Sequence, residues 1–120
     1  MTITQAVHRL PIHDLYGVVA VLLEQETGTE RLDRWYRALL CLLGRECLER
    51  NGEHVDADDE ELLTGILRAT IALTDDELNI LTASLVLSAD SFPNTPLGVF
   101  FERLLDLTCH FWLERSPLAA

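Results

Sequence analysis

Residues 29–52 read TERLDRWYRALLCLLGRECLERNG, and this stretch decides the fold class. Its apolar side chains recur at the 3.6-residue period of an α-helix and fall within one arc. The members of that arc are Leu32, Trp35, Tyr36, Leu39, Leu40, Leu43 and Cys47. Arg31, Arg34 and Arg45 lie on the opposite arc. Thr29 is a typical N-cap and Asn51-Gly52 a typical stop, so the stretch predicts an amphipathic helix ending near residue 50.

Start and stop signals on both sides of this stretch predict further helices. Towards the N-terminus, Asp14 is expected to cap a helix over residues 15–25, which Gly28 closes. The β-branched residues of 18–23 would also suit a buried strand, but no other segment offers a strand partner. Residues 1–12 are predicted to form a short helix or an extended arm that ends at Pro11.

Three more helices are predicted after residue 52. Asp58 with Glu61, and Thr74 with Glu77, have the spacing of capping boxes. The short joint between the helices that they begin predicts near-antiparallel neighbours. The second of these helices carries no charge over residues 79–89, which is typical of a central helix or a subunit interface. Thr95-Pro96 begins a helix that runs to about residue 113. The expected fold is all-α: one domain over residues 1–120, a bundle of about five helices.

Charge sets the expected partners. The net charge is −11, all nine basic residues are arginine, and −9 of that charge lies in residues 56–120. Absence of lysine favours a GC-rich genome. Such an acidic surface repels nucleic-acid phosphates and anionic lipids and attracts basic proteins. We therefore expect a protein partner with a basic surface, no direct nucleic-acid binding and no membrane binding.

Three cysteines without framework spacing, and no visible signal peptide, predict reduced core thiols in a cytoplasmic protein. No serine elbow, glycine-rich phosphate loop or metal-ligand spacing occurs. His54 and its neighbouring carboxylates resemble metal ligands by residue type alone. The sequence therefore predicts a non-enzymatic protein with no cofactor and no metal.

Two acidic clusters are the candidate protein-binding residues. The first comprises Asp56, Asp58, Asp59, Glu60 and Glu61, and the second Asp75, Asp76 and Glu77. Each cluster is either a docking surface or helix-start chemistry, because carboxylates in a first turn complement the helix dipole.

An aromatic set is the other candidate site. Its members are Trp35, Tyr36, Phe100, Phe101, Phe111 and Trp112. They are expected to be core, a dimer interface, or the lining of a ligand pocket between the helices beginning at Thr29 and Thr95.

Together these features favour an acidic helical adaptor, inhibitor or immunity-type protein that acts by binding another protein. Small acidic helical proteins of this class are common in bacteria and phages. The alternative is a ligand-binding or sensory bundle that uses the aromatic set. Apolar faces wider than one small bundle needs predict a homodimer.

Overall fold

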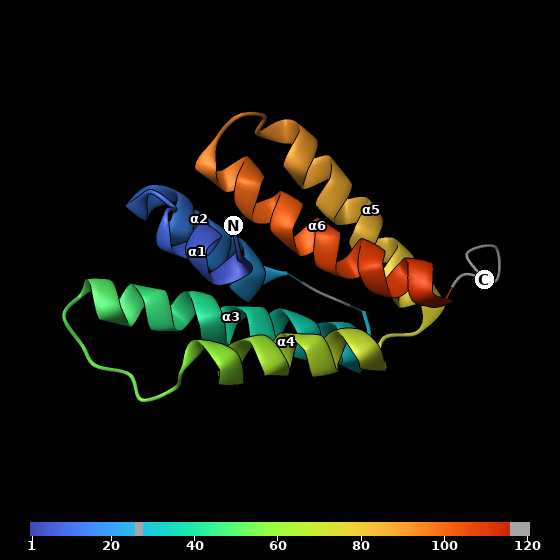
Figure 1. Ribbon diagram of the computed structural model, residues 1–120, viewed down its shortest axis with the longest axis horizontal. Helices are drawn as coiled ribbons and strands as arrows, with labels where there is room; N and C mark the ends of the chain where they lie inside the picture. The colour runs from blue at the N-terminus through green and yellow to red at the C-terminus, as the bar shows by residue number, and fades with distance from the viewer. Residues whose placement is uncertain (26–27, 116–120) are drawn as a thin grey trace. The chain divides into compact units, whose positions relative to one another are not determined.

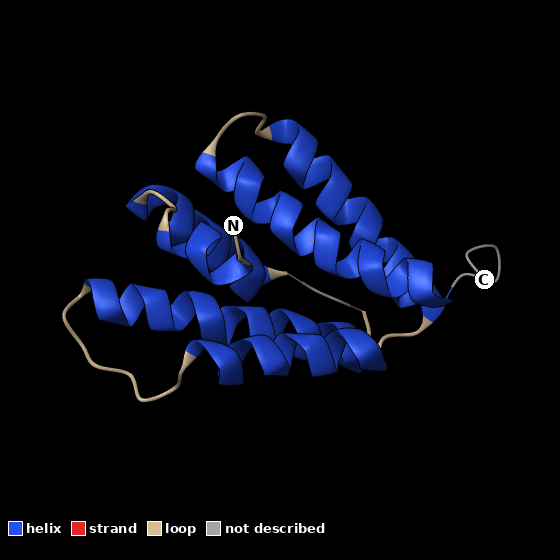
Figure 2. Ribbon diagram, in the orientation of Figure 1, coloured by secondary structure: helices blue, strands red, loops and turns tan. Residues whose placement is uncertain are grey.

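The computed structural model describes residues 1–25 and 28–115, and every regular element in that part of the chain is an α-helix (Figure 2). The helices in chain order are α1 (Ile3–His8), α2 (Ile12–Glu24), α3 (Glu30–Arg50), α4 (Asp59–Ala72), α5 (Asp75–Ser91) and α6 (Pro96–Arg115). The all-α prediction is confirmed. The expected count of about five is low by one, because residues 3–8 form a helix of their own.

The chain divides into two compact units. The central unit is Leu10–Ala72 and contains α2, α3 and α4; the terminal unit combines Met1–Arg9 with the described residues from Leu73 onward. In each unit two long helices lie side by side, α3 with α4 and α5 with α6 (Figure 1). One shorter helix packs against each pair: α2 contacts α3 in the central unit, and α1 contacts α6 in the terminal unit. The expectation of one domain over residues 1–120 stays a prediction.

The predicted caps place most helix starts correctly. The Thr29 hydroxyl accepts from the Leu32 amide at 3.2 Å and begins α3. Thr74 and Glu77 form a complete capping box at the start of α5. The Thr95 hydroxyl accepts from the Gly98 amide at 3.0 Å, next to Pro96, the first residue of α6. These side chains satisfy amides that the first turn of a helix leaves without a backbone partner.

The start of the second helix is where the sequence reading is wrong. α2 begins at Ile12, directly after Pro11, and Asp14 lies in its first turn rather than at its cap. Proline suits a helix start because it has no amide hydrogen that the first turn would leave unpaired. Pro11 therefore begins α2, whereas the sequence reading used it only to end the preceding segment. The residues considered as a possible strand lie inside α2.

The core of the central unit is centred on Trp35. Its ring is fully buried, and its indole N–H donates to the Thr70 hydroxyl of α4 at 2.9 Å. Thr70 in turn donates to the Ile66 carbonyl at 2.7 Å, so both buried polar groups are satisfied. Leu39, Leu43 and Ile66 are buried as well, which confirms the core face predicted for α3. The contact between Trp35 and Thr70 shows why α4 pairs with α3.

The core of the terminal unit lies between α5 and α6. Leu78, Leu81 and Leu85 are buried along one side of α5, and Phe100 and Leu104 are buried on α6. The two helices are therefore the partners of one hairpin. The short joint at Leu73–Thr74 lies where the two units meet along the chain, so the predicted near-antiparallel pairing of α4 with α5 stays a prediction. α5 is one-sided rather than central, because its other side is exposed.

Candidate functional site

The first acidic cluster lies at the start of α4 and serves largely local structure. The Asp58 carboxylate accepts from the Glu61 amide at 2.8 Å and caps the helix. Asp59, Glu60 and Glu61 occupy the first turn, where negative charge complements the helix dipole. Asp56 lies 3.0 Å from the His54 imidazole, and both side chains are exposed. Of the five side chains, those of Glu60 and Glu61 have no partner among the described residues and act through the helix dipole alone.

The second acidic cluster lies in the first turn of α5, in the other unit. Glu77 is buried and accepts from the Thr74 amide at 2.8 Å. Asp75 lies 3.5 Å from the Arg115 guanidinium. Asp76 is exposed and forms no ion pair with any residue that the structure describes. The three neighbouring carboxylates therefore differ: Glu77 is buried in the cap, Asp75 is exposed but lies beside Arg115, and Asp76 is exposed without an ion pair in the described part of the chain.

The aromatic set divides between the two units. In the central unit Trp35 is buried and meets Tyr36 edge-on, with ring centroids 5.4 Å apart. In the terminal unit Phe101 stacks on Phe92, and the Trp112 indole N–H donates to Asn79. Phe100 is core and Phe111 is half-buried. The prediction that all six line one pocket is not tested.

A cavity of about 360 Å³ occurs in the terminal unit, away from the aromatic residues. Its lining is Met1, Ala6, Arg9, Asn94, Thr95, Pro96 and Val99. This volume is at the lower end of small-molecule pockets. It lies beside α1 and the start of α6, where no site was predicted from the sequence.

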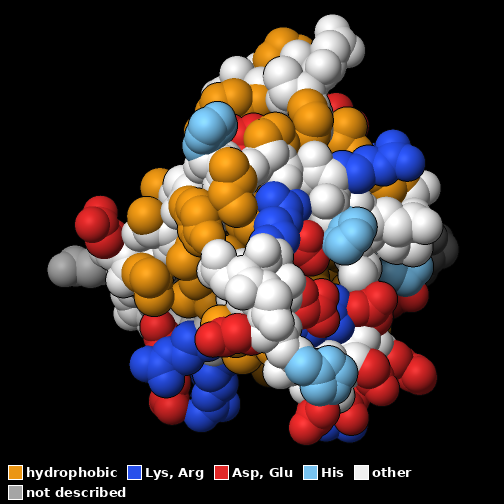
Figure 3. Space-filling model, turned by 90° about the vertical axis from the view of Figure 1, so that its left-hand side faces the viewer, with side chains coloured by type: hydrophobic (Ala, Val, Ile, Leu, Met, Phe, Trp, Pro, Cys, Tyr) orange, Lys and Arg blue, Asp and Glu red, His pale blue; other side chains and the backbone are white. Residues whose placement is uncertain are grey.

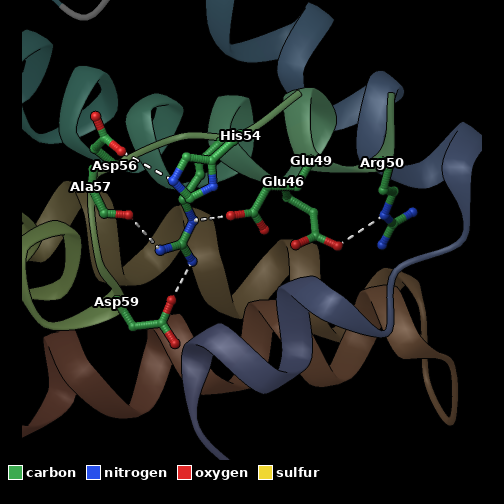
Figure 4. A network of polar contacts seen from close by, with 8 residues as sticks. Glu46, Glu49, Arg50, His54, Asp56, Ala57 and Asp59 are labelled. Atoms are coloured by element: carbon green, nitrogen blue, oxygen red, sulfur yellow. Dashed lines mark hydrogen bonds and ion pairs between the residues drawn. The ribbon is translucent and has the colours of Figure 1, made fainter. Parts of the chain in front are cut away.

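Sequence reasoning missed an ionic cluster that forms around the buried side chain of Arg45 (Figure 4). Arg45 was placed on the polar arc of α3, yet its side chain is only 8% exposed. Its guanidinium donates to the Ala57 carbonyl at 3.2 Å and forms an ion pair with Asp59. Glu49 lies 3.9 Å away, on the same helix. The sequence does contain one indication that Arg45 is buried: the apolar residue Leu42 lies three positions earlier, on the same side of α3. The structure shows that Leu42 is fully buried.

The Arg45 cluster fixes the loop between α3 and α4. Ala57 belongs to that loop and Asp59 is the first residue of α4, so one side chain holds both. Beside it, buried Glu46 accepts from Arg50 at 2.9 Å (Figure 4). Opposite charges are thus paired within the cluster, as burial requires. No group of three His, Cys, Asp or Glu residues suited to hold a metal ion occurs in the described part of the chain.

Burial changes the pKa of one thiol and one phenol in the central unit. Burial raises the pKa of the Cys47 thiol, and the nearby Arg50 charge opposes that rise. Burial likewise raises the pKa of Tyr36, against a hydrogen bond donated by Gln25. Cys47 and Cys109 are partly buried, whereas Cys41 is exposed on α3, so the expectation of three core thiols is wrong for Cys41.

Two exposed apolar helix faces remain, one in each unit. Tyr16 and Leu23 on one side of α2 are 44% and 70% exposed, and Ile80 and Leu87 on one side of α5 are 63% and 70% exposed. Leu15 is the only buried residue of α2. Hydrophobic side chains are open to solvent on the face drawn in Figure 3, alongside acidic groups. Exposed apolar faces of this kind are typical of protein–protein contact surfaces.

Charges are arranged differently along the two faces. On α2, Ile12, Tyr16 and Leu23 follow one line along the helix, and that line carries no carboxylate. On α5, the line through Ile80 and Leu87 has an aspartate at each end, Asp76 and Asp90. The two faces therefore suit partners of different charge.

Comparison with family models, with characterised proteins and with solved structures finds no match to this chain. Within the described residues, no helix has the length and apolar character needed to cross a membrane. Function must therefore be argued from the residues themselves.

Proposed function

We propose that the protein is a non-catalytic binding protein that holds another protein against its exposed apolar faces. The observation that carries this proposal is the exposure of Tyr16 and Leu23 on one face of α2, and of Ile80 and Leu87 on one face of α5, the two helices with the longest uncharged stretches. Large apolar side chains gathered on one helix face are uncommon on the surface of a protein that acts alone. An acidic adaptor or inhibitor of a basic protein is the class that these features favour.

The acidic clusters have a smaller part in this proposal than the sequence suggested. Asp58, Asp59 and Glu77 are engaged in caps and in the Arg45 ion pair, so they stabilise the fold first. The net charge of −11 still acts at a distance, because it attracts basic partners and accelerates their approach. Apolar contact then supplies the affinity.

We infer that the predicted homodimer forms through α2. Two copies of the line Ile12, Tyr16 and Leu23 can meet across a two-fold axis without bringing carboxylates onto the seam. Light scattering behind a sizing column should give twice the 13.5 kDa chain mass, and Leu23→Ser should return the protein to monomer. A wild-type mass of one chain at high micromolar concentration would reject the homodimer.

Binding to another protein is tested by capture from the native lysate with matched variants. Leu23→Ser and Leu87→Ser each remove one face, and Leu48→Ser removes an exposed leucine of α3 that belongs to neither face. We expect a specific protein that the wild type and Leu48→Ser retain and one face variant loses. Capture of nothing, or equal capture by all variants, would contradict the proposal.

A small-molecule site is the second candidate function, and the cavity beside α1 favours it. Arg9 places a guanidinium at a small, mainly apolar cavity. A thermal-shift screen against small organic acids is the test. A shift in the wild type that Arg9→Gln abolishes would support this candidate, and no shift with any compound would remove it.

A further inference from the structure

The exposed face of α5 carries a regular pattern of residue types. Asp76, Ile80, Ala83, Leu87 and Asp90 follow one another at spacings of four, three, four and three residues, and all five are exposed. This is the spacing with which a helix presents one continuous seam to another helix. Leu78, Leu81 and Leu85 point the other way, into the core of the terminal unit. The seam thus has three apolar positions between two carboxylates.

Both carboxylates at the ends of this seam lack an internal partner. Neither Asp76 nor Asp90 forms an ion pair with any other residue in the described ranges 1–25 and 28–115. Asp90 lies in the last turn of α5, which contains no basic residue. Negative charge at that end opposes the helix dipole. Asp90 is therefore unfavourable for the isolated helix.

The distance between the two carboxylates defines what can cover the seam. Asp76 and Asp90 are fourteen residues apart, which is about 21 Å along a helix. A helix laid along α5 would place residues fourteen positions apart opposite the two carboxylates. Three of its residues between those positions would face Ile80, Ala83 and Leu87. Ala83 is small, so the middle position has room for a large apolar side chain.

Charge excludes a second copy as the best occupant. Two α5 helices related by a two-fold axis through Ala83 would run antiparallel and place Asp76 opposite Asp90 of the other copy at both ends. Like charges directly opposite each other destabilise such a pair. Arginine or lysine at the same two positions converts both contacts into attraction.

We propose that this seam binds an amphipathic helix of another protein with two basic residues fourteen positions apart. Its apolar residues lie at the fourth, seventh and eleventh positions after the first basic residue. The inference rests on the proposed binding function and names the partner's chemistry at one of the two faces. This pattern is the one for a partner helix that runs parallel to α5; an antiparallel helix would meet both aspartates with its apolar residues at the third, seventh and tenth positions.

A synthetic peptide tests the pattern directly. The probe is a fluorescein-labelled helical peptide with lysines fourteen positions apart and leucines at the three intervening positions. The control peptide has the same composition, with both lysines moved to the opposite face. Fluorescence anisotropy against the full chain should give a Kd at least tenfold lower for the probe, with the difference shrinking as salt is added. Equal affinity of the two peptides would overturn the proposal.

Variants of the protein assign the contacts. Asp76→Asn and Asp90→Asn should each weaken binding of the probe several-fold, and Leu87→Ser should abolish it. Glu102→Gln removes one exposed carboxylate from α6, off the seam, and should leave the affinity unchanged. Circular dichroism confirms that each variant is folded. Unchanged affinity in both aspartate variants would show that charge does not select the partner, and would overturn the proposal.

Two further outcomes separate this inference from the proposed function. If a native partner is lost by Leu23→Ser but kept by Leu87→Ser, the protein is a binding protein and the assignment to α5 is wrong. If wild-type dimers dissociate on Leu87→Ser but not on Leu23→Ser, a second copy covers the seam and the basic-helix proposal is wrong.

Discussion

The two helical hairpins have the same plan but close in different ways. Between α3 and α4 the chain makes a loop of several residues, and the buried guanidinium of Arg45 ties that loop to the start of α4. Between α5 and α6 the loop is shorter and needs no charge. There the Thr95 hydroxyl bridges the Phe92 carbonyl and the Gly98 amide, and Gly98 lies directly against the Phe92 backbone. One hairpin depends on an ion pair, the other on close backbone contact.

The largest expected effect is the same in both hairpins. Trp35 and Phe100 are the largest fully buried side chains, one in each unit. Replacing either with Ala removes an aromatic ring from a packed core, and we expect the free energy of unfolding to fall by about 3–5 kcal/mol. Urea titration followed by circular dichroism measures both. A loss below about 1 kcal/mol for one of them would mean that its hairpin is loosely packed.

The next effect separates the two closures. A Cβ atom on Gly98 would lie 2.0 Å from the Phe92 carbonyl oxygen, so the backbone must shift. We expect Gly98→Ala to lower the free energy of unfolding by about 2–3 kcal/mol. The matched control is Gly65→Ala in α4, where no atom lies within 4 Å of the added methyl group. The control should raise stability by about 0.5–1 kcal/mol, because glycine is a poor helix former. Equal effects at both positions would contradict the close contact.

The ion pair of the α3–α4 hairpin should give a smaller loss. Arg45→Met leaves the Ala57 carbonyl without its donor, but Asp59 is 59% exposed and keeps much of its hydration. We expect a loss of about 1–2 kcal/mol, below the 3–5 kcal/mol typical when a fully buried charge loses its partner. Arg34→Met breaks the exposed pair with Glu30 and should change stability by less than about 0.5 kcal/mol. Losses of equal size would show that burial adds nothing to the Arg45 pair.

Smaller losses than for Arg45→Met are expected at the helix caps. Thr74→Ala and Thr95→Ala each remove a hydroxyl that accepts from a first-turn amide, so each should lower stability by about 1 kcal/mol. Thr74→Ser and Thr95→Ser keep the hydroxyl and should restore most of the loss. An unchanged urea midpoint in both alanine variants would show that these two hydroxyls do not stabilise α5 and α6.

Local signals predicted local structure well. Capping residues and the 3.6-residue period are properties of neighbouring positions, so Thr29, Thr74 and Thr95 marked their helices correctly. Pairing of helices depends on which side chains fit together. The Trp35–Thr70 hydrogen bond joins residues 35 positions apart, and no pattern within either helix indicates it. The pairing of α4 with α3 could therefore not be predicted from the sequence. Arg45 was misplaced because charge was taken to indicate exposure.

The sequence predicted contact surfaces but not which side of a helix forms them, and their function stays a prediction. Long uncharged stretches pointed to contact surfaces, and the exposed residues of α2 and α5 lie within them. Periodicity alone could not say which side of α5 its own unit covers. Leu78, Leu81 and Leu85 are buried, and their burial identifies the opposite side of α5, between Asp76 and Asp90, as the exposed one.

The open apolar faces of α2 and α5 also determine the colloidal behaviour of the protein. At neutral pH the molecules carry −11 and repel one another, which opposes non-specific association through apolar side chains at low ionic strength. At the isoelectric point near pH 4.5 that repulsion vanishes, while the exposed apolar side chains remain. A turbidity scan should therefore show a sharp maximum near pH 4.5. Leu23→Ser combined with Leu87→Ser should flatten that maximum without moving it, since neither change alters the charge.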